Sequence, residues 1–266
     1  VLQLEPTLKH ARDDREGDSD VAVAFDDVTL QYKNAGEPSL EHISFTVPRG
    51  SVVGIIGGTG SGKSSLVSLI PHFYDVKDGR VSVFGKNICA YDDEDLRHRI
   101  GYVQQKAVLF QGTVRSNLLW GDDSASDDDL RTALSTAQVL DIVADKGGLD
   151  APVEQNGANF SGGQKQRLSV ARALVRKPQI LVLDDSSSAL DYATEAAMRK
   201  AILALPYKPT LFVVSQRASS VMCADRILVL EDGRLVGDGT HKALLANCPV
   251  YCEIYHSQFS EEVTDA

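Results

Sequence analysis

Apolar and polar positions alternate along the first part of the chain with the two-residue period of β-strands. The alternation is clear at residues 21–32 and returns at 43–47, and Gly36-Glu37-Pro38 marks a turn between the two segments. A continuous apolar run at 52–56 is typical of a strand that is buried on both faces. Further strands are predicted at residues 80–84 and 100–103.

The second half alternates between helical and apolar strand patterns. A helical tract runs from Thr113 to about Ala144, and a second helix runs from Ser161 to about Arg176, where Lys177-Pro178 stops it. Asp232-Gly233 predicts a hairpin turn, and the tail from His241 is helical. Buried strands are predicted at 180–183, 211–214 and 227–230. This order predicts an α/β fold with a β-rich start, a parallel core and a helical insert.

A glycine-rich segment between the strand at 52–56 and the following helix carries the clearest chemistry. Its spacing fits GxxxxGK[ST] in the strand-loop-helix context that this pattern requires. Backbone N–H groups of such a loop cradle phosphate oxygens, while Lys63 adds positive charge and the Ser64 hydroxyl is placed to bind Mg²⁺. The alternative is a plain glycine-rich turn. The predicted nucleotide-binding residues are Gly57, Gly58, Thr59, Gly60, Ser61, Gly62, Lys63, Ser64 and Ser65.

A second glycine-rich turn opens the helix at 161–176. Its residues Ser161, Gly162, Gly163 and Gln164 could bind an anion through free backbone N–H groups and a hydroxyl. The alternative is an ordinary helix cap, because Ser is a favoured cap residue. The apolar strand at 180–183 then ends in two adjacent carboxylates.

Together these motifs closely resemble the ATP-binding cassette family, and the resemblance covers residues 21–259. It implies a P-loop ATPase fold with a RecA-like parallel core, an antiparallel β subdomain and a helical subdomain at about 106–176. It also implies ATP and Mg²⁺ as ligands. In this family two cassettes dimerise head to tail, so that each ATP lies between one cassette's P-loop and the other's signature motif.

The resemblance gives each motif residue a role. Tyr32 would stack on adenine, and residues 57–65 would be the Walker A motif. Gln105 would reach Mg²⁺ and sense a transmembrane partner, and Asp184 would hold Mg²⁺ together with Ser64. Residues 161–164 would be the signature motif, with Phe160 in place of the usual Leu, and residues 188–191 the D-loop.

Two positions depart from the family pattern. Asp185 stands where a Glu general base is usual, and Gln216 stands where a His is usual. Asp is shorter by one methylene, and a misplacement of about 1 Å can cost roughly a hundredfold in rate. Gln216 can donate a hydrogen bond but cannot carry the charge of a protonated His. The predicted catalytic residues are therefore Asp185, Gln216 and Gln105, and they would form a weakly active site.

An impaired Walker side beside an intact signature motif is the pattern of one half of a heterodimeric multidrug exporter. Residues 1–20 would then be the linker from an absent transmembrane domain, and residues 260–266 a C-terminal tail. The predicted partners are a second cassette and the transmembrane domains of both chains, at the cytoplasmic face of the plasma membrane. Two alternatives remain: an active homodimeric ATPase, and a clamp module without a transport role.

Composition narrows these possibilities. The chain of 266 residues has a net charge of −10, which argues against nucleic acid as a partner. No apolar run approaches the roughly 20 residues of a membrane-spanning helix. The four cysteines form no zinc-type pairs, and a reducing compartment fits them best.

Overall fold

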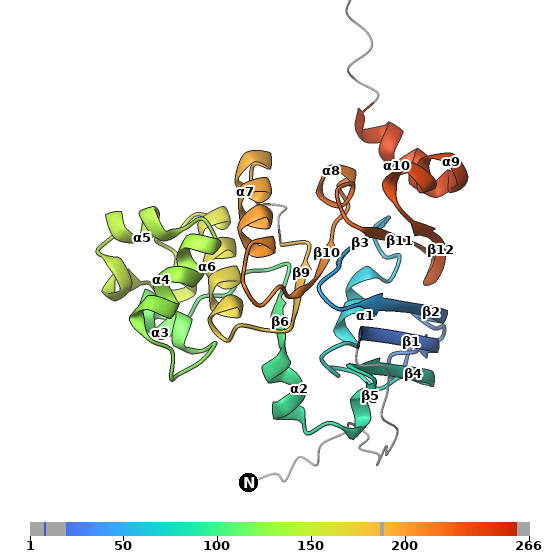
Figure 1. The fold of residues 1–266 in the computed structure, drawn as a ribbon, viewed down its shortest axis with the longest axis horizontal. Coiled ribbons are helices and arrows are strands. Elements are labelled where there is room, and N and C mark those ends of the chain that lie inside the picture. Colours follow the sequence, from blue (N-terminus) through green and yellow to red (C-terminus); the bar gives the residue numbers. More distant parts are fainter. Residues whose placement is uncertain (1–7, 9–19, 187–188, 260–266) are drawn as a thin grey trace, which may run out of the picture.

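The computed structural model describes residue 8, residues 20–186 and residues 189–259. The predicted linker at 1–20 therefore lies almost entirely outside the described residues, and the tail at 260–266 and Ser188 of the predicted D-loop lie wholly outside them. The described elements form two large sheets with helices around them, and a small two-stranded sheet (Figure 1). The predicted α/β class is confirmed.

The larger sheet has six strands in the order β12-β11-β3-β10-β9-β6. Neighbouring strands are parallel except for the β11–β12 hairpin, whose turn is the predicted Asp232-Gly233. The strands are β3 (Val52–Gly57), β6 (Ile100–Val103), β9 (Ile180–Asp184), β10 (Thr210–Val214), β11 (Arg226–Glu231) and β12 (Arg234–Gly239).

The smaller sheet is antiparallel, with the strand order β2-β1-β4-β5. This sheet contains the strands predicted near the start of the chain. It lies at the opposite end of the molecule from helices α3–α6 (Figure 1). Its strands are β1 (Val21–Leu30), β2 (Leu40–Pro48), β4 (Asp78–Val83) and β5 (Lys86–Asn87).

Two hydrophobic clusters lie on the two faces of the six-stranded sheet. Side chains of a strand point alternately to opposite faces, and β3 divides accordingly. Val53 and Ile55 join the cluster formed with the antiparallel sheet, α1 and α2, whereas Val52 and Ile56 join the cluster formed with helices from later in the chain. The six-stranded sheet is therefore packed on both of its faces.

The helical tract predicted from Thr113 to Ala144 is divided into α3, α4 and α5. The break after α3 is a turn in which the Asp122 carboxylate accepts hydrogen bonds from the backbone and hydroxyl of Ser124. Thr113 itself ends the short strand β7, which pairs with β8. These elements are β7 (Gly112–Thr113), α3 (Val114–Leu119), α4 (Asp127–Thr136), α5 (Leu140–Asp145) and β8 (Pro152–Val153).

The remaining helices include the predicted helix at 161–176 and a helix, α2, that the sequence patterns did not predict. The helix expected at 161–176 is α6, with Ser161 as its N-cap and Arg176 as its C-cap. Helix α6 spans Gly162–Val175. The others are α1 (Lys63–Ser68), α2 (Asp93–Arg99), α7 (Tyr192–Leu203), α8 (Ala218–Val221), α9 (His241–Asn247) and α10 (Pro249–Phe259), with 3₁₀ turns η1 (Ile88–Ala90), η2 (Gly148–Asp150) and η3 (Gln155–Gly157).

Candidate functional site

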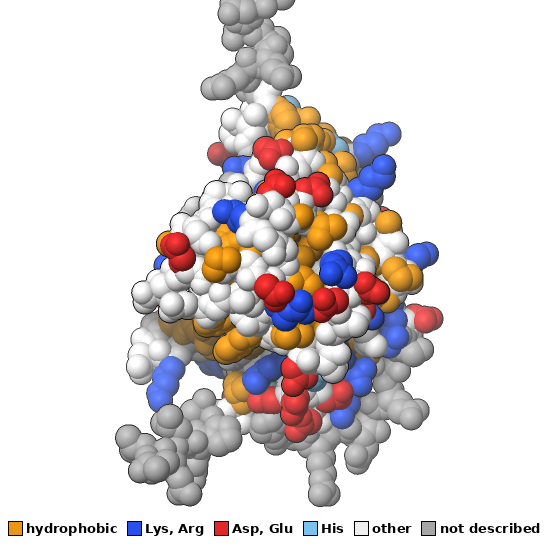
Figure 2. All heavy atoms as spheres, turned by 90° about the vertical axis from the view of Figure 1, so that its left-hand side faces the viewer, with side chains coloured by type: hydrophobic (Ala, Val, Ile, Leu, Met, Phe, Trp, Pro, Cys, Tyr) orange, Lys and Arg blue, Asp and Glu red, His pale blue; other side chains and the backbone are white. Residues whose placement is uncertain are grey.

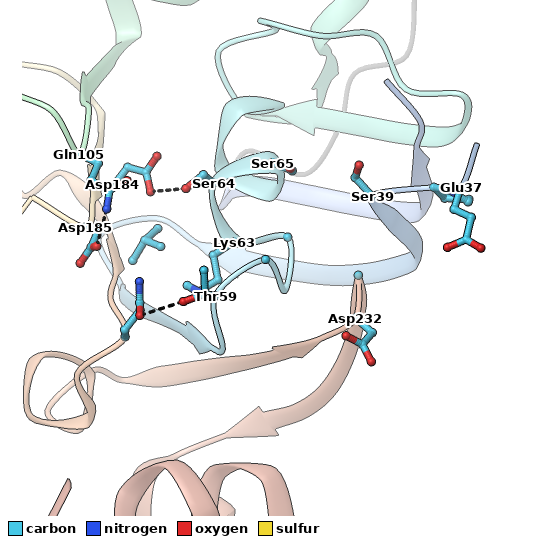
Figure 3. A pocket seen from close by; sticks show the side chains of 16 residues that line it. Glu37, Ser39, Thr59, Lys63, Ser64, Ser65, Gln105, Asp184, Asp185 and Asp232 are labelled. Atoms are coloured by element: carbon cyan, nitrogen blue, oxygen red, sulfur yellow. Dashed lines mark hydrogen bonds between the residues drawn. The ribbon is translucent and has the colours of Figure 1, made fainter. Parts of the chain in front are cut away.

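A pocket of about 700 Å³ lies where the parallel strands of the larger sheet end. The loop after β3, the last residue of β9 and the segment after β10 all contribute to its wall, together with residues 37–39 and 232–233 (Figure 3). Ligands of open α/β sheets bind outside the carboxyl ends of the strands. The position of the pocket therefore agrees with the site expected from the sequence motifs.

The loop at 57–65 curls around the ammonium group of Lys63. Lys63 Nζ donates hydrogen bonds to the carbonyl oxygens of Gly57 at 2.9 Å and Gly58 at 2.6 Å, and to Ser61 Oγ at 3.4 Å. Burial lowers the pKa of Lys63, an effect that the carboxylates near it oppose. Gly62 has a φ of +98°, a conformation that glycine adopts without strain. The loop thus presents a buried cation beside the pocket.

Five of these loop residues line the pocket beside Lys63: Thr59, Gly60, Gly62, Ser64 and Ser65.

The Ser64 hydroxyl and the Asp184 carboxylate point toward one another in the pocket wall (Figure 3). Ser64 Oγ donates a hydrogen bond of 2.9 Å to Asp184 Oδ1. Tyr102 donates a second bond of 2.9 Å to Asp184 Oδ2. Burial and the negative charge of Asp184 raise the pKa of the Tyr102 phenol, so this group stays a donor. Hydroxyl and carboxylate oxygens in this arrangement suit a hard cation such as Mg²⁺.

Asp185 follows β9 in a left-handed conformation, with a φ of +46°. Its Oδ2 accepts a hydrogen bond of 2.9 Å from Gln105 Nε2, which joins the segment after β6 to the segment after β9. Burial raises the pKa of Asp185, and the charge of Asp184 raises it further. The predicted residues Gln105, Asp184 and Asp185 are therefore brought together at one wall of the pocket.

Gln216 lies on the wall formed after β10. Its Oε1 accepts a hydrogen bond of 3.4 Å from the Thr59 hydroxyl. The terminal helix α10 holds this segment through Gln258, whose Nε2 donates to the Gln216 carbonyl and whose Oε1 accepts from the Ala218 N–H, both at 2.8 Å. Sequence patterns gave no indication of the role of Gln258, because it lies far along the chain from Gln216.

Tyr32 lies beside the pocket rather than in its lining. Its hydroxyl donates a hydrogen bond of 2.9 Å to Ser65 Oγ, and its ring makes an edge contact with Tyr74 at 4.9 Å between ring centroids. Ser65 lines the pocket. The ring therefore stands one side chain away from the cavity wall.

The predicted signature residues 161–164 are not among the residues that line this pocket in the described chain. Ser161 and Gln164 form a reciprocal capping box at the start of α6, and α6 stands well away from α1 (Figure 1). A Cβ atom on Gly163 would lie 2.9 Å from the Ala189 carbonyl oxygen, so the turn packs closely on the segment before α7. The helix-cap interpretation is thus correct locally.

Comparison with known proteins decides the family. The family model described as ABC transporter matches residues 40–188, which is more than half of the chain. The chain belongs to the ABC transporter family. The family predicted from the sequence motifs is confirmed.

Several relatives share this similarity. The chain is 42% identical over 245 residues to the uncharacterised ABC transporter ATP-binding protein YfiB of Bacillus subtilis, covering 92% of this chain and 42% of that protein. It is 39% identical over 241 residues to the ATP-dependent lipid A-core flippase of Haemophilus ducreyi, covering 90% and 41%. The chain thus spans less than half the length of these curated relatives.

A solved structure gives the same result for the fold. The structure of a bacterial Atm1-family ABC exporter with ATP bound matches with a TM-score of 0.88 and 34% identity, over 96% of this chain and 45% of that chain. The ABC ATPase fold predicted from the motifs is confirmed. No helix in the described part of this ABC chain is both long and apolar enough to span a membrane.

Replacing Asp185 by Asn should stabilise this ABC domain near neutral pH. Burial and Asp184 raise the pKa of Asp185 in the folded state, so above that pKa the charged carboxylate opposes folding. The gain should vanish as the pH falls to about 3.9, the unfolded value, where both states are protonated. Thermal unfolding midpoints of the two proteins across this pH range provide the measurement.

Asp232→Asn is the matched control, because Asp232 is an exposed carboxylate of the same pocket and also has a positive φ, of +45°. Asn adopts this left-handed conformation as readily as Asp does. The prediction would be wrong if Asp185→Asn raised stability equally at every pH, or if it lowered stability at neutral pH. Either result would show that the charge of Asp185 does not destabilise the folded state.

Proposed function

We propose that the chain is the ATP-binding domain of an ABC exporter and that its pocket binds ATP with Mg²⁺. The observation that carries this proposal is the convergence of Lys63, Ser64 and Asp184 on one pocket at the carboxyl edge of the parallel sheet. Lys63 would exchange its loop carbonyl partners for phosphate oxygens. The glycine-rich backbone would supply further N–H donors to the same phosphates.

Ser64 and Asp184 would hold the cation, with Gln105 as a further oxygen ligand. The direct bond between Ser64 and Asp184 sets their oxygens 2.9 Å apart, on the side of the loop where the outer phosphates would lie. Bound Mg²⁺ would neutralise charge on the phosphates during hydrolysis. Tyr102 would fix the orientation of the Asp184 carboxylate by its hydrogen bond to Oδ2.

Hydrolysis at this pocket would be weak. The raised pKa of Asp185 makes its carboxylate a stronger base than usual, so basicity is not the deficiency. Its shortcoming would be reach, because the side chain is one methylene short and is already hydrogen-bonded to Gln105. Gln216 offers an amide where a titratable imidazole would serve, and its Oε1 is engaged by Thr59.

The signature turn would act on ATP that is held by a second cassette. Its four residues lie outside the pocket of their own chain, and the N–H groups of Gly162 and Gly163 open α6, a helix of 14 residues. A helix start of this kind attracts phosphate. Head-to-tail pairing with a partner of intact Walker residues would then yield a heterodimer with one strong and one weak site.

A membrane domain would dock in the apolar hollows beside α3 and α6. Two adjoining hollows of about 250 and 260 Å³ share Phe73, Tyr102, Phe110 and Arg172 in their walls. Trp120 stacks on Phe110 at 4.5 Å with 65% of its surface exposed. Figure 2 views the α3–α6 end of the molecule, and hydrophobic side chains reach the surface there. Within the described chain, Arg172 Nη1 is buried without a hydrogen-bond partner, so an acceptor from the docked segment would complete it.

In this assembly residues 21–259 would be the cassette and residues 106–176 its helical subdomain, at the cytoplasmic face of the plasma membrane.

Tyr32→Ala should weaken ATP binding by roughly 1–3 kcal/mol if the ring stacks on adenine. Tyr32→Phe is the matched control, because it loses only the bond to Ser65 and keeps the stacking face. Calorimetric titration with ATP and Mg²⁺ measures the ATP affinity of both Tyr32 variants, and Lys63→Ala serves as a reference that should not bind ATP. If Tyr32→Ala binds ATP with unchanged affinity, the Tyr32 ring does not contact the adenine.

The double variant Asp185→Glu with Gln216→His should raise ATP turnover by about 10²-fold or more when a partner cassette supplies its signature motif, since a positioned base contributes roughly 10²–10⁴. Each single variant shows which residue limits the rate. No gain in steady-state turnover with ATP affinity intact would place the defect elsewhere in this pocket.

Ser161→Ala or Gly162→Val in this chain should abolish most ATP hydrolysis at the partner's site, while ATP binding to this chain's own pocket is retained. Asp185→Asn should do far less, because that position is already impaired. The measurement is the steady-state ATPase activity of the assembled pair with one substitution at a time. The reverse ranking, with Asp185 essential and Ser161 dispensable, would return the chain to the active homodimeric ATPases.

A further inference from the structure

Three metal-binding side chains of different chemistry meet outside the pocket, between the segment after α1 and the 3₁₀ turn η1. They are His72, Asp75 and Cys89, and their donor atoms all lie within 4.8 Å of one another. His72 is fully buried, whereas Asp75 and Cys89 are partly exposed. We propose that these three residues form a Zn²⁺ site. This inference does not depend on the proposed ATP site.

The two distances from His72 to the other ligands come close to those of a tetrahedral zinc centre. His72 Nε2 lies 3.0 Å from Asp75 Oδ1 and 3.8 Å from Cys89 Sγ. Zinc bond lengths of about 2.0–2.3 Å at tetrahedral angles place neighbouring ligand atoms roughly 3.3–3.6 Å apart. The donor atoms of Asp75 and Cys89 lie within 4.8 Å of each other, and both side chains are partly exposed, so they can move closer around an ion. Water would be the fourth ligand.

The donor set selects zinc rather than the Mg²⁺ of the pocket. Imidazole nitrogen and thiolate sulfur favour Zn²⁺, while Mg²⁺ requires oxygen ligands. Binding would release the Cys89 thiol proton and leave His72 protonated at Nδ1 alone. Asp93 Oδ1 lies 3.9 Å from that nitrogen, on the side where a carboxylate would orient a metal-bound imidazole. With two anionic ligands the bound ion would be formally neutral.

The site would fix a segment that supports other side chains of the molecule. Residues 73 and 74 lie between two of the ligands, with Phe73 in edge contact with Tyr102 at 5.3 Å and Tyr74 in edge contact with Tyr32 at 4.9 Å. Cys89 belongs to η1, next to the antiparallel sheet. Zinc would thus tie these two aromatic rings to that sheet.

Cobalt binding tests the proposal, because Co²⁺ replaces Zn²⁺ and a thiolate ligand gives it a sulfur-to-metal charge-transfer absorption. The untagged, metal-free chain is titrated with Co²⁺ and then with Zn²⁺, without nucleotide and with a reductant that contains no thiol. One equivalent of Co²⁺ should produce the absorption, and Zn²⁺ should remove it. Carboxylates of the pocket cannot produce this signal.

Cys89→Ser should abolish the absorption and lower Zn²⁺ affinity by at least about 100-fold, since loss of an outer-shell contact alone costs about 10–100-fold. Asp75→Asn should keep the absorption but weaken Zn²⁺ binding, and it provides the test if Cys89→Ser does not fold. Cys252→Ser and Cys223→Ser are the matched controls and should bind as the parent chain does. No charge-transfer absorption in the parent chain, or an equal one in Cys89→Ser, would overturn the site.

Discussion

Parallel pairing of β3 with β10, and of β10 with β9 and β9 with β6, is the constraint on which the rest of the structure depends. Because parallel strands share a direction, each strand delivers the residues that follow it to the same edge. Lys63, Gln105, Asp184 and Gln216 are far apart in sequence, yet they reach one pocket for this reason. The two hydrophobic cores pack on either face of the sheet and so support the strands that lead to this edge.

At that edge of the sheet, two adjacent carboxylates must be accommodated in one wall of the pocket. Asp184 and Asp185 are adjacent carboxylates in a partly buried wall, and burial together with the charge of Asp184 raises the pKa of Asp185. The pocket compensates with donors: Ser64 and Tyr102 to Asp184, and Gln105 to Asp185. These donors are neutral, so the hydrogen bonds satisfy the carboxylate oxygens without adding positive charge to this wall.

The sequence predicted the sheet class, the glycine-rich loop and the residues at the strand ends, because those features follow from local periodicity and from turn chemistry. It did not predict Tyr102 as a partner of Asp184, or Gln258 as a partner of Gln216, because each pair is joined only by tertiary folding. It also described residues 113–144 as one helical tract. The Asp122 turn divides that tract, and the side-chain bonds of such turns are weak signals in a single sequence.

The contact between Gln258 and Gln216 connects the end of the chain to the wall of the pocket. Gln258 binds backbone groups on both sides of Arg217, so it holds the segment after β10 whichever side chain stands at position 216. A histidine at that position would therefore inherit the same backbone path as Gln216. The backbone of this wall consequently supports either side chain, so the weak hydrolysis that we propose would depend on the side chains of Asp185 and Gln216 and not on the path of the backbone.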